Sequence, residues 1–161
     1  MKLNLGSSGE RRIGFENVDC REEVCPDILM DLNVLPWSFA NNSIEDIIAH
    51  EVIEHLTISP EEFIKECFRI LAPGGRLNII VPNCFHIKTR LQILFGRIPF
   101  HGYCPFHTMF TKPSYILEYM NRIGFWRIRN MDRSKWHFLG LTWLNRDLFS
   151  PASRFIGWKT P

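Results

Sequence analysis

Polar side chains capable of binding a ligand follow several short apolar segments of this chain, at the point where each segment ends. They are the small-residue turn Gly6-Ser7-Ser8-Gly9, then Asp19, Asp31 and the pair His50-Glu51. Ligands of open α/β sheets bind at the carboxyl ends of strands, where glycine turns and carboxylates can meet. Their order along the chain therefore indicates a nucleotide site.

The apolar segments predict the strands that position these side chains. They span residues 3–5, 15–20, 28–30, 44–49, 77–81 and 125–131, with a further candidate at 136–143. Ser59 and Glu62 form a capping box before a helix that ends near Leu71, and a second helix spans about 113–123. The turn at residues 72–75 leads from the first helix into the next strand. The pattern predicts an α/β, doubly wound three-layer sandwich with a mostly parallel sheet and an antiparallel strand near the C terminus.

The first connection is unusually short. Only about five residues separate Gly9 from the second strand, whereas a helical crossover needs a dozen or more. We expect the first crossover helix to be short or missing and an irregular loop to replace it.

The overall composition is that of a soluble globular domain. The chain has 161 residues, with 45% hydrophobic and 22% charged, which suits a single domain over 1–161. It has no apolar run as long as a membrane span, and its five scattered cysteines do not suggest a disulfide framework. A cytoplasmic protein is the expectation.

Charge divides the chain into two halves. Residues 1–83 hold 7 Lys/Arg and 14 Asp/Glu, whereas residues 84–161 hold 12 and 3, together with 16 of the 21 aromatic side chains. A basic, aromatic surface can face nucleic acid, anionic lipid or an acidic small substrate, although many of these rings can also simply pack a core.

Three other kinds of site are weaker interpretations. A dinucleotide site needs G-x-G-x-x-G opening a helix, but the glycines here are spaced G-x-x-G and no helix follows. His50 and His55 are five residues apart, so they do not share a helix face as zinc-protease histidines do, and His55 is expected to pack between sheet and helix. Soft ligands also occur between 84 and 107, without a paired C-x-x-C: Cys84, His86, His101, Cys104 and His107.

Several short motifs together resemble one family. They are the strand and turn at residues 3–9, Asn17-Val18-Asp19, Asp31-Leu32 with Leu35-Pro36, Glu54-His55-Leu56, and Leu71 with Pro73-Gly74-Gly75. No single motif is specific, but their order and spacing resemble the class I S-adenosylmethionine-dependent methyltransferases, in short members of the Rossmann-like fold. The family turn usually has a further glycine where this chain has Ser7-Ser8.

The resemblance implies roles for the residues at the strand ends. Gly6 to Gly9 would let the backbone approach the methionine part of S-adenosyl-L-methionine, and Asp19 would accept hydrogen bonds from the ribose hydroxyls. Asp31 and the Leu32 backbone would lie beside the adenine. His50 and Glu51 would line the sulfonium region, with His50 as the candidate catalytic base and His101 or His107 as competitors.

These features together predict a methyltransferase that acts on an unidentified acceptor. Residues 1–83 would bind the cofactor, 84–112 would form a lid or acceptor insertion, and 113–161 would add a helix, strands and a tail. The acceptor would be a small molecule or a group linked to lipid or glycan. Nucleic acid remains an alternative that no RNA-binding motif supports. The competing hypothesis is a catalytically degenerate module that keeps the fold and acts in regulation or assembly.

Overall fold

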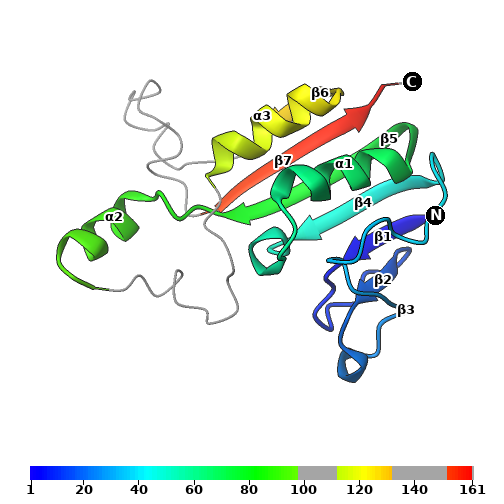
Figure 1. Ribbon diagram of the computed structural model, residues 1–161, viewed down its shortest axis with the longest axis horizontal. Coiled ribbons are helices and arrows are strands. Elements are labelled where there is room, and N and C mark those ends of the chain that lie inside the picture. Colours follow the sequence, from blue (N-terminus) through cyan, green and yellow to red (C-terminus); the bar gives the residue numbers. More distant parts are fainter. Residues whose placement is uncertain (98–111, 132–151, 161) are drawn as a thin grey trace.

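A seven-stranded sheet forms the centre of the molecule in the computed structural model, which describes residues 1–97, 112–131 and 152–160 (Figure 1). The strand order is β3-β2-β1-β4-β5-β7-β6. The strands are β1 (Lys2–Leu5), β2 (Glu16–Asp19), β3 (Ile28–Leu29), β4 (Ile44–His50), β5 (Leu71–Pro82), β6 (Phe125–Asn130) and β7 (Ala152–Lys159). The helices are α1 (Pro60–Ile70), α2 (Ile87–Leu94) and α3 (Pro113–Ile123), with short 3-10 turns η1 (Glu22–Val24) and η2 (Ile53–His55).

The sheet confirms the predicted fold class. Strands β3, β2, β1, β4 and β5 pair in parallel, and β7 pairs antiparallel with both β5 and β6. The order reverses between β1 and β4, where β1 leads outward to β2 and β3. In doubly wound sheets such a reversal opens a crevice at the carboxyl ends of the strands.

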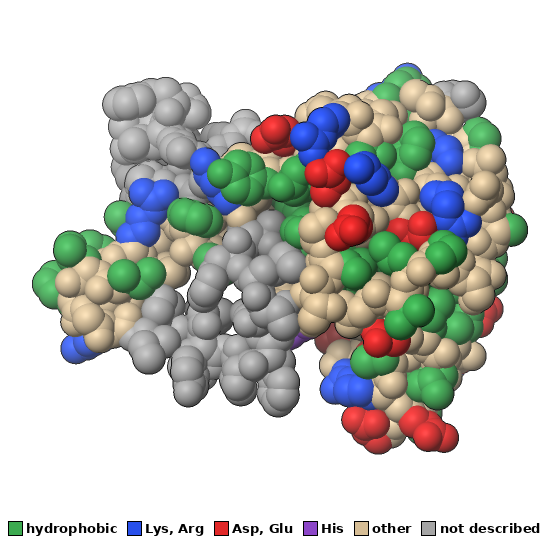
Figure 2. Space-filling model, viewed as in Figure 1, with side chains coloured by type: hydrophobic (Ala, Val, Ile, Leu, Met, Phe, Trp, Pro, Cys, Tyr) green, Lys and Arg blue, Asp and Glu red, His purple; other side chains and the backbone are tan. Residues whose placement is uncertain are grey.

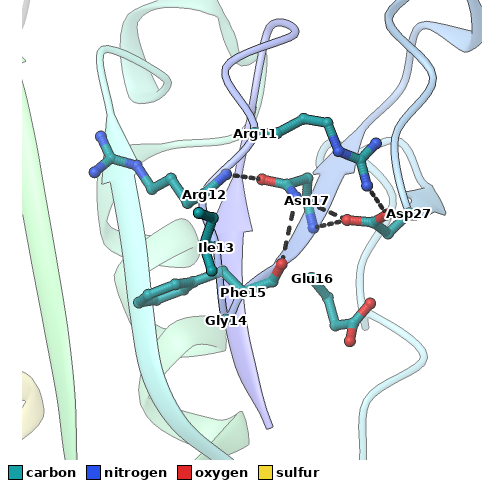
Figure 3. A pocket seen from close by; sticks show the side chains of 8 residues that line it. All are labelled: Arg11, Arg12, Ile13, Gly14, Phe15, Glu16, Asn17 and Asp27. Atoms are coloured by element: carbon teal, nitrogen blue, oxygen red, sulfur yellow. Dashed lines mark hydrogen bonds and ion pairs between the residues drawn. The ribbon is translucent and has the colours of Figure 1, made fainter.

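No helix connects β1 to β2, as the sequence predicts, and side-chain amides hold the intervening loop instead (Figure 3). Asn17 Oδ1 accepts from the backbone N–H of Arg12 at 3.0 Å, and Asn17 Nδ2 donates to Asp27 Oδ2 at 2.7 Å. The Asn4 side chain donates to the carbonyl of Glu10 at 3.0 Å. A cavity of about 410 Å³ on this loop has both Arg11 and Arg12 in its lining. In Figure 3 the Arg12 side chain points away from Asn17.

Helices α1 and α3 contact each other, and α1 packs on β5 while α3 packs on β6 and β7 (Figure 1). The capping box at the start of α1 is present, with Ser59 accepting from the backbone N–H of Glu62 and Glu62 accepting from that of Ser59. Phe63, Ile64 and Cys67 are fully buried, as their helical spacing predicts. This face of the sheet therefore holds the main core.

The structure corrects the sequence prediction in two places. The expected turn at 72–75 lies inside β5, where the register with β4 shifts between Ile44 and Asp46. Strand β7 is antiparallel and near the C terminus, as predicted, but its position was not predicted, because the residues from 145 onward show no clear period. The candidate strand at 136–143 lies outside the described residues. In the described part of the chain no helix is long and apolar enough to cross a membrane.

Candidate cofactor site

A cavity of about 440 Å³ lies at the carboxyl ends of β1, β2, β3 and β4. Its lining comes from the turns that follow these strands and from η2: Gly6, Ser8, Asp19, Cys20, Arg21, Met30, Asp31, Leu32, Asn33, Glu51, Val52, His55 and Leu56. The volume falls within the range of small-molecule sites, and the lining combines apolar walls with a few polar groups. The crevice expected from the strand order is therefore a formed pocket.

The turn after β1 brings backbone close to the cavity. Gly6 has φ +61, and a Cβ at this position would lie 2.7 Å from Cγ2 of Val52 on the opposite wall. Only glycine fits here without displacing Val52. Ser8 also has a left-handed backbone, with φ 47, a conformation that costs a serine about 1 kcal/mol or more. Strain of this kind is common where structure is adapted to a ligand.

Asp19 is the most strongly held acidic side chain of the cavity. Its Oδ2 accepts from the backbone N–H of Ser8 at 2.8 Å, and its Oδ1 accepts from the backbone N–H and Nε of Arg21 at 3.0 and 3.1 Å. Burial opposes ionisation, but the bonds from Arg21 and Ser8 outweigh it and keep the pKa of Asp19 below its ordinary value. The side chain is therefore an ionised, oriented acceptor at neutral pH.

The turn after β3 is fixed by local hydrogen bonds. Asp31 Oδ1 accepts from both the backbone N–H and the side-chain amide of Asn33, at 2.9 and 3.0 Å. Asn33 Oδ1 accepts in turn from the backbone N–H of Thr57 at 2.7 Å. Leu32 is buried, and its carbonyl accepts from Trp37 Nε1 at 3.2 Å. Hydrogen bonds therefore fix both the Asp31–Asn33 turn and the backbone of Leu32 in this wall of the cavity.

His50 and Glu51 are neighbours in the sequence at the end of β4, but only Glu51 lines the cavity. Glu51 has φ 54 and lines the cavity, with its backbone N–H bonded to the carbonyl of Ile80. His50 is half-buried and does not line it; its Nδ1 lies 3.1 Å from Nη2 of Arg12. Burial lowers the pKa of His50, and the nearby guanidiniums of Arg12 and Arg154 lower it further. His50 is therefore neutral at neutral pH.

The hydrogen bond also fixes the tautomer of His50. A guanidinium can only donate, so Nδ1 must accept from Arg12 and the neutral ring carries its proton on Nε2. In this arrangement Nε2 is a hydrogen-bond donor, and this atom is buried. The proposal that His50 is a base would require Arg12 to move.

The cavity brings together most of the residues predicted from the sequence, but not all of them. Gly6, Ser8, Asp19, Asp31, Leu32 and Glu51 line it, whereas Ser7, Gly9 and His50 do not. Arg21 and His55 line it without having been predicted as site residues. Arg21 follows Asp19 by two positions, and this proximity to a strand-end carboxylate was the available signal.

For a metal, the described ranges offer no group of three or more His, Cys, Asp or Glu side chains that could hold one. The candidate ligands His101, Cys104 and His107 lie outside those ranges.

Comparison with known proteins identifies the resemblance in sequence. A family model described as a methyltransferase domain matches residues 15–79. A probable S-adenosylmethionine-dependent methyltransferase of Mycolicibacterium smegmatis is 33% identical over 94 residues, which make up 58% of this chain and 33% of that protein. The chain thus spans about a third of the length of this curated relative.

Solved structures extend the likeness to the fold. A methyltransferase from Archaeoglobus fulgidus, described as SAM-dependent, matches with a TM-score of 0.68 at 15% identity, over 98% of this chain and 85% of that one. The chain resembles the class I S-adenosylmethionine-dependent methyltransferases in both sequence and fold. The YcgJ protein of Bacillus subtilis matches with a TM-score of 0.66 at 13% identity, over 99% and 92%. A phosphoethanolamine N-methyltransferase of Haemonchus contortus in complex with S-adenosylmethionine matches at 0.63 and 14%, over 99% and 48%.

The cavity fits the cofactor of these methyltransferases. An ionised carboxylate at the end of β2 suits ribose hydroxyls, which can donate to it. Val52 and Leu56 offer apolar contacts, and the absence of a side chain at Gly6 lets Val52 pack directly against the turn. The donor set and shape of the site therefore agree with S-adenosylmethionine.

Proposed function

We propose that this chain binds S-adenosylmethionine in the cavity at the ends of β1, β2 and β4 and transfers its methyl group to an acceptor. The observation that carries the proposal is the position of Asp19. It ends β2, lines the cavity beside the turn that begins at Gly6, and is held ionised by Arg21 and Ser8. The match of residues 15–79 to a methyltransferase domain supports the same assignment.

Each part of the cofactor would contact different residues of the cavity. Asp19 would accept from the ribose hydroxyls, and Asp31 would accept from the adenine amine beside the backbone of Leu32. The turn from Gly6 to Gly9 would border the methionine part, and a side chain at Gly6 would displace Val52 from this part of the cavity. Glu51 would lie near the amino group or sulfonium, since both are positively charged.

Methyl transfer would require little covalent chemistry from the protein itself. When bound, S-adenosylmethionine supplies a methyl group already activated by its sulfonium. Protein groups then need to align the acceptor with the methyl carbon and exclude water. Strained positions at Ser8 and Glu51 fix two sides of the cavity in advance, so little reorganisation is needed on binding.

His50 remains the candidate catalytic residue, and the structure suggests how it would act. It would donate a hydrogen bond to the acceptor through Nε2 only if this buried atom became accessible, and it would act as a base only after losing its contact with Arg12. His50→Gln retains a donor whereas His50→Ala does not. If His50 is a donor, the Gln variant should keep more of kcat than the Ala variant; equal losses would argue for the base role.

We propose that residues 84–112 build the acceptor side, because β5 leads into them directly beyond the cofactor half, residues 1–83. The excess of Lys and Arg in the second half of the chain favours an acidic acceptor, or one linked to lipid or glycan, over a neutral metabolite. Residues 113–161 complete the sheet through β6 and β7.

Calorimetric titration with S-adenosylmethionine and S-adenosylhomocysteine tests the proposal. Asp19→Asn removes the ionised acceptor, and hydrogen bonds to charged groups are worth about 1.5–3 kcal/mol, so Kd should rise roughly 10- to 100-fold. Asp46→Asn is the matched control, because Asp46 is also a buried, arginine-paired aspartate on the sheet but lies outside the cavity.

Three outcomes would count against the proposal. Failure of the wild-type protein to bind either ligand at millimolar concentration would refute the cofactor site. An equal loss of affinity in the Asp19 and Asp46 variants would show that Asp19 acts only through folding. Binding that is normal but never followed by methyl transfer would favour the alternative of a degenerate module.

A further inference from the structure

Helix α2 differs from the other two helices because it buries none of its residues. Helices α1 and α3 each bury at least three side chains. On α2 and the residue after it, Leu91 is 46% exposed, Ile93 61%, Leu94 75% and Phe95 75%. In Figure 1 the helix lies at one end of the molecule, away from β1–β3, and Figure 2 shows hydrophobic side chains gathered there.

A shallow cavity of about 630 Å³ runs along this helix. It is lined by Ile87, Lys88, Leu91, Gln92, Phe95 and Arg97. The apolar residues Ile87, Leu91 and Leu94 recur at helical spacing and form one stripe. Lys88 and Arg90 fall on the two sides of that stripe by the same helical period.

No acidic side chain in the described part of the chain neutralises the cations around the stripe. The sequence has no Asp or Glu between Glu66 and Glu118. Among the residues that the structure describes, no ion pair involves Lys88, Arg90 or Arg97. The exposed apolar surface is therefore accompanied by positive charge that no described acidic side chain compensates.

We propose that α2 and the residues that follow it to Arg97 bind the surface of an anionic membrane. Interfacial helices bury an apolar stripe at the headgroup boundary while flanking Lys and Arg contact anionic headgroups. A second copy of the chain is a poorer occupant, because a symmetric contact would bring the cations of both copies together. This membrane binding does not depend on methyl transfer. It would, however, bring the acceptor side that begins after β5 close to lipid-linked groups.

Vesicle co-sedimentation of the whole chain tests this proposal. The wild-type protein should bind vesicles that contain phosphatidylglycerol and should bind pure phosphatidylcholine vesicles at least tenfold more weakly. Added salt should weaken the binding, because it screens the Lys and Arg contribution. Absence of binding to the anionic vesicles would overturn the proposal.

Variants of the exposed side chains locate the contact. The double change Leu94→Ser and Phe95→Ser should lower the bound fraction at least tenfold, and so should Lys88→Gln with Arg97→Gln. Because all four side chains are exposed, the thermal midpoint should not change. Ile13→Ser is the matched control, since Ile13 is fully exposed on the distant β1–β2 loop.

The Ile13 variant distinguishes a specific membrane contact at α2 from non-specific adsorption of exposed hydrophobic side chains. Equal loss of vesicle binding in the Ile13 variant and in the α2 variants would refute a site on α2. Sedimentation of the wild-type protein as a dimer that the Phe95 change dissociates, without vesicle binding, would assign the surface to a second copy instead.

Discussion

Glu54 provides a direct test of how a buried carboxyl group near the cavity affects the free energy of unfolding. It lies in η2, which connects β4 to α1, and its side chain is buried, with the residue only 3% exposed. Burial raises the pKa of Glu54 to about 7 from its ordinary value of 4.5, and the charge of Glu51 raises it in the same direction. Folding therefore favours the protonated form. The stability that this group contributes is complete below pH 4.5 and is lost as the pH rises through 7.

The magnitude follows from the two pKa values. A gap from 4.5 to about 7 corresponds to about 3 kcal/mol in the free energy of unfolding. About 2.5 kcal/mol of this loss should occur between pH 5 and pH 8, because the unfolded chain already ionises in part at pH 5. Glu54→Gln cannot ionise, so the variant should escape this loss. Relative to wild type it should gain about 2.5 kcal/mol on going from pH 5 to pH 8.

Urea unfolding followed by tryptophan fluorescence measures this difference, since Trp37 is buried in the core. Any fixed cost of the Gln side chain cancels when the two pH values are compared. Glu118→Gln, on the exposed side of α3, should show no such pH-dependent gain. A wild-type-to-variant difference that stays constant within about 0.5 kcal/mol between pH 5 and pH 8 would refute the reasoning.

Three further changes test the turn and the first helix. Gly6→Ala should weaken cofactor binding at least tenfold in calorimetry and lower the thermal midpoint, because its Cβ would meet Val52 at 2.7 Å; unchanged values would show that Val52 can move aside. Ser8→Gly should raise the free energy of unfolding by about 1 kcal/mol, since it relieves a left-handed backbone; a loss in urea melts would contradict this. Ser59→Ala should cost about 1 kcal/mol by removing the cap shared with Glu62, and no loss in the same assay would mean that water replaces it.

Much of the fold could be predicted because local chemistry and final structure agree. The cap at Ser59 and the stripe that includes Phe63 determine α1 without reference to the rest of the molecule. The residues that form the antiparallel strand β7 could not be predicted, because two of its three inward positions are Ser153 and Gly157, so hydrophobic alternation is lost. Pairing with β5 and β6, rather than a pattern in its own sequence, therefore determines that this segment is a strand.

The site was predictable wherever a residue ends a strand. Asp19 and Asp31 follow β2 and β3, and parallel strands bring their carboxyl ends together. His50 and His55 were less predictable because orientation decides their roles. A left-handed residue, Glu51, follows His50, and a 3-10 turn carries His55 to the cavity. No clear sequence pattern predicts the left-handed backbone at Glu51 or the 3-10 turn at His55.

The position of β7 has a consequence for how the chain acquires its structure. Among the described strands β6 pairs only with β7, and β5 pairs on that side only with β7. During synthesis, β5 and β6 therefore leave the ribosome before the strand that joins them. Until residues 152–159 emerge, β5 presents an unpaired edge and β6 has no place in the sheet. Among the described strands, the one that joins β6 to the rest of the sheet follows β6 in the chain, so this part of the sheet depends on late, non-local pairing for its stability.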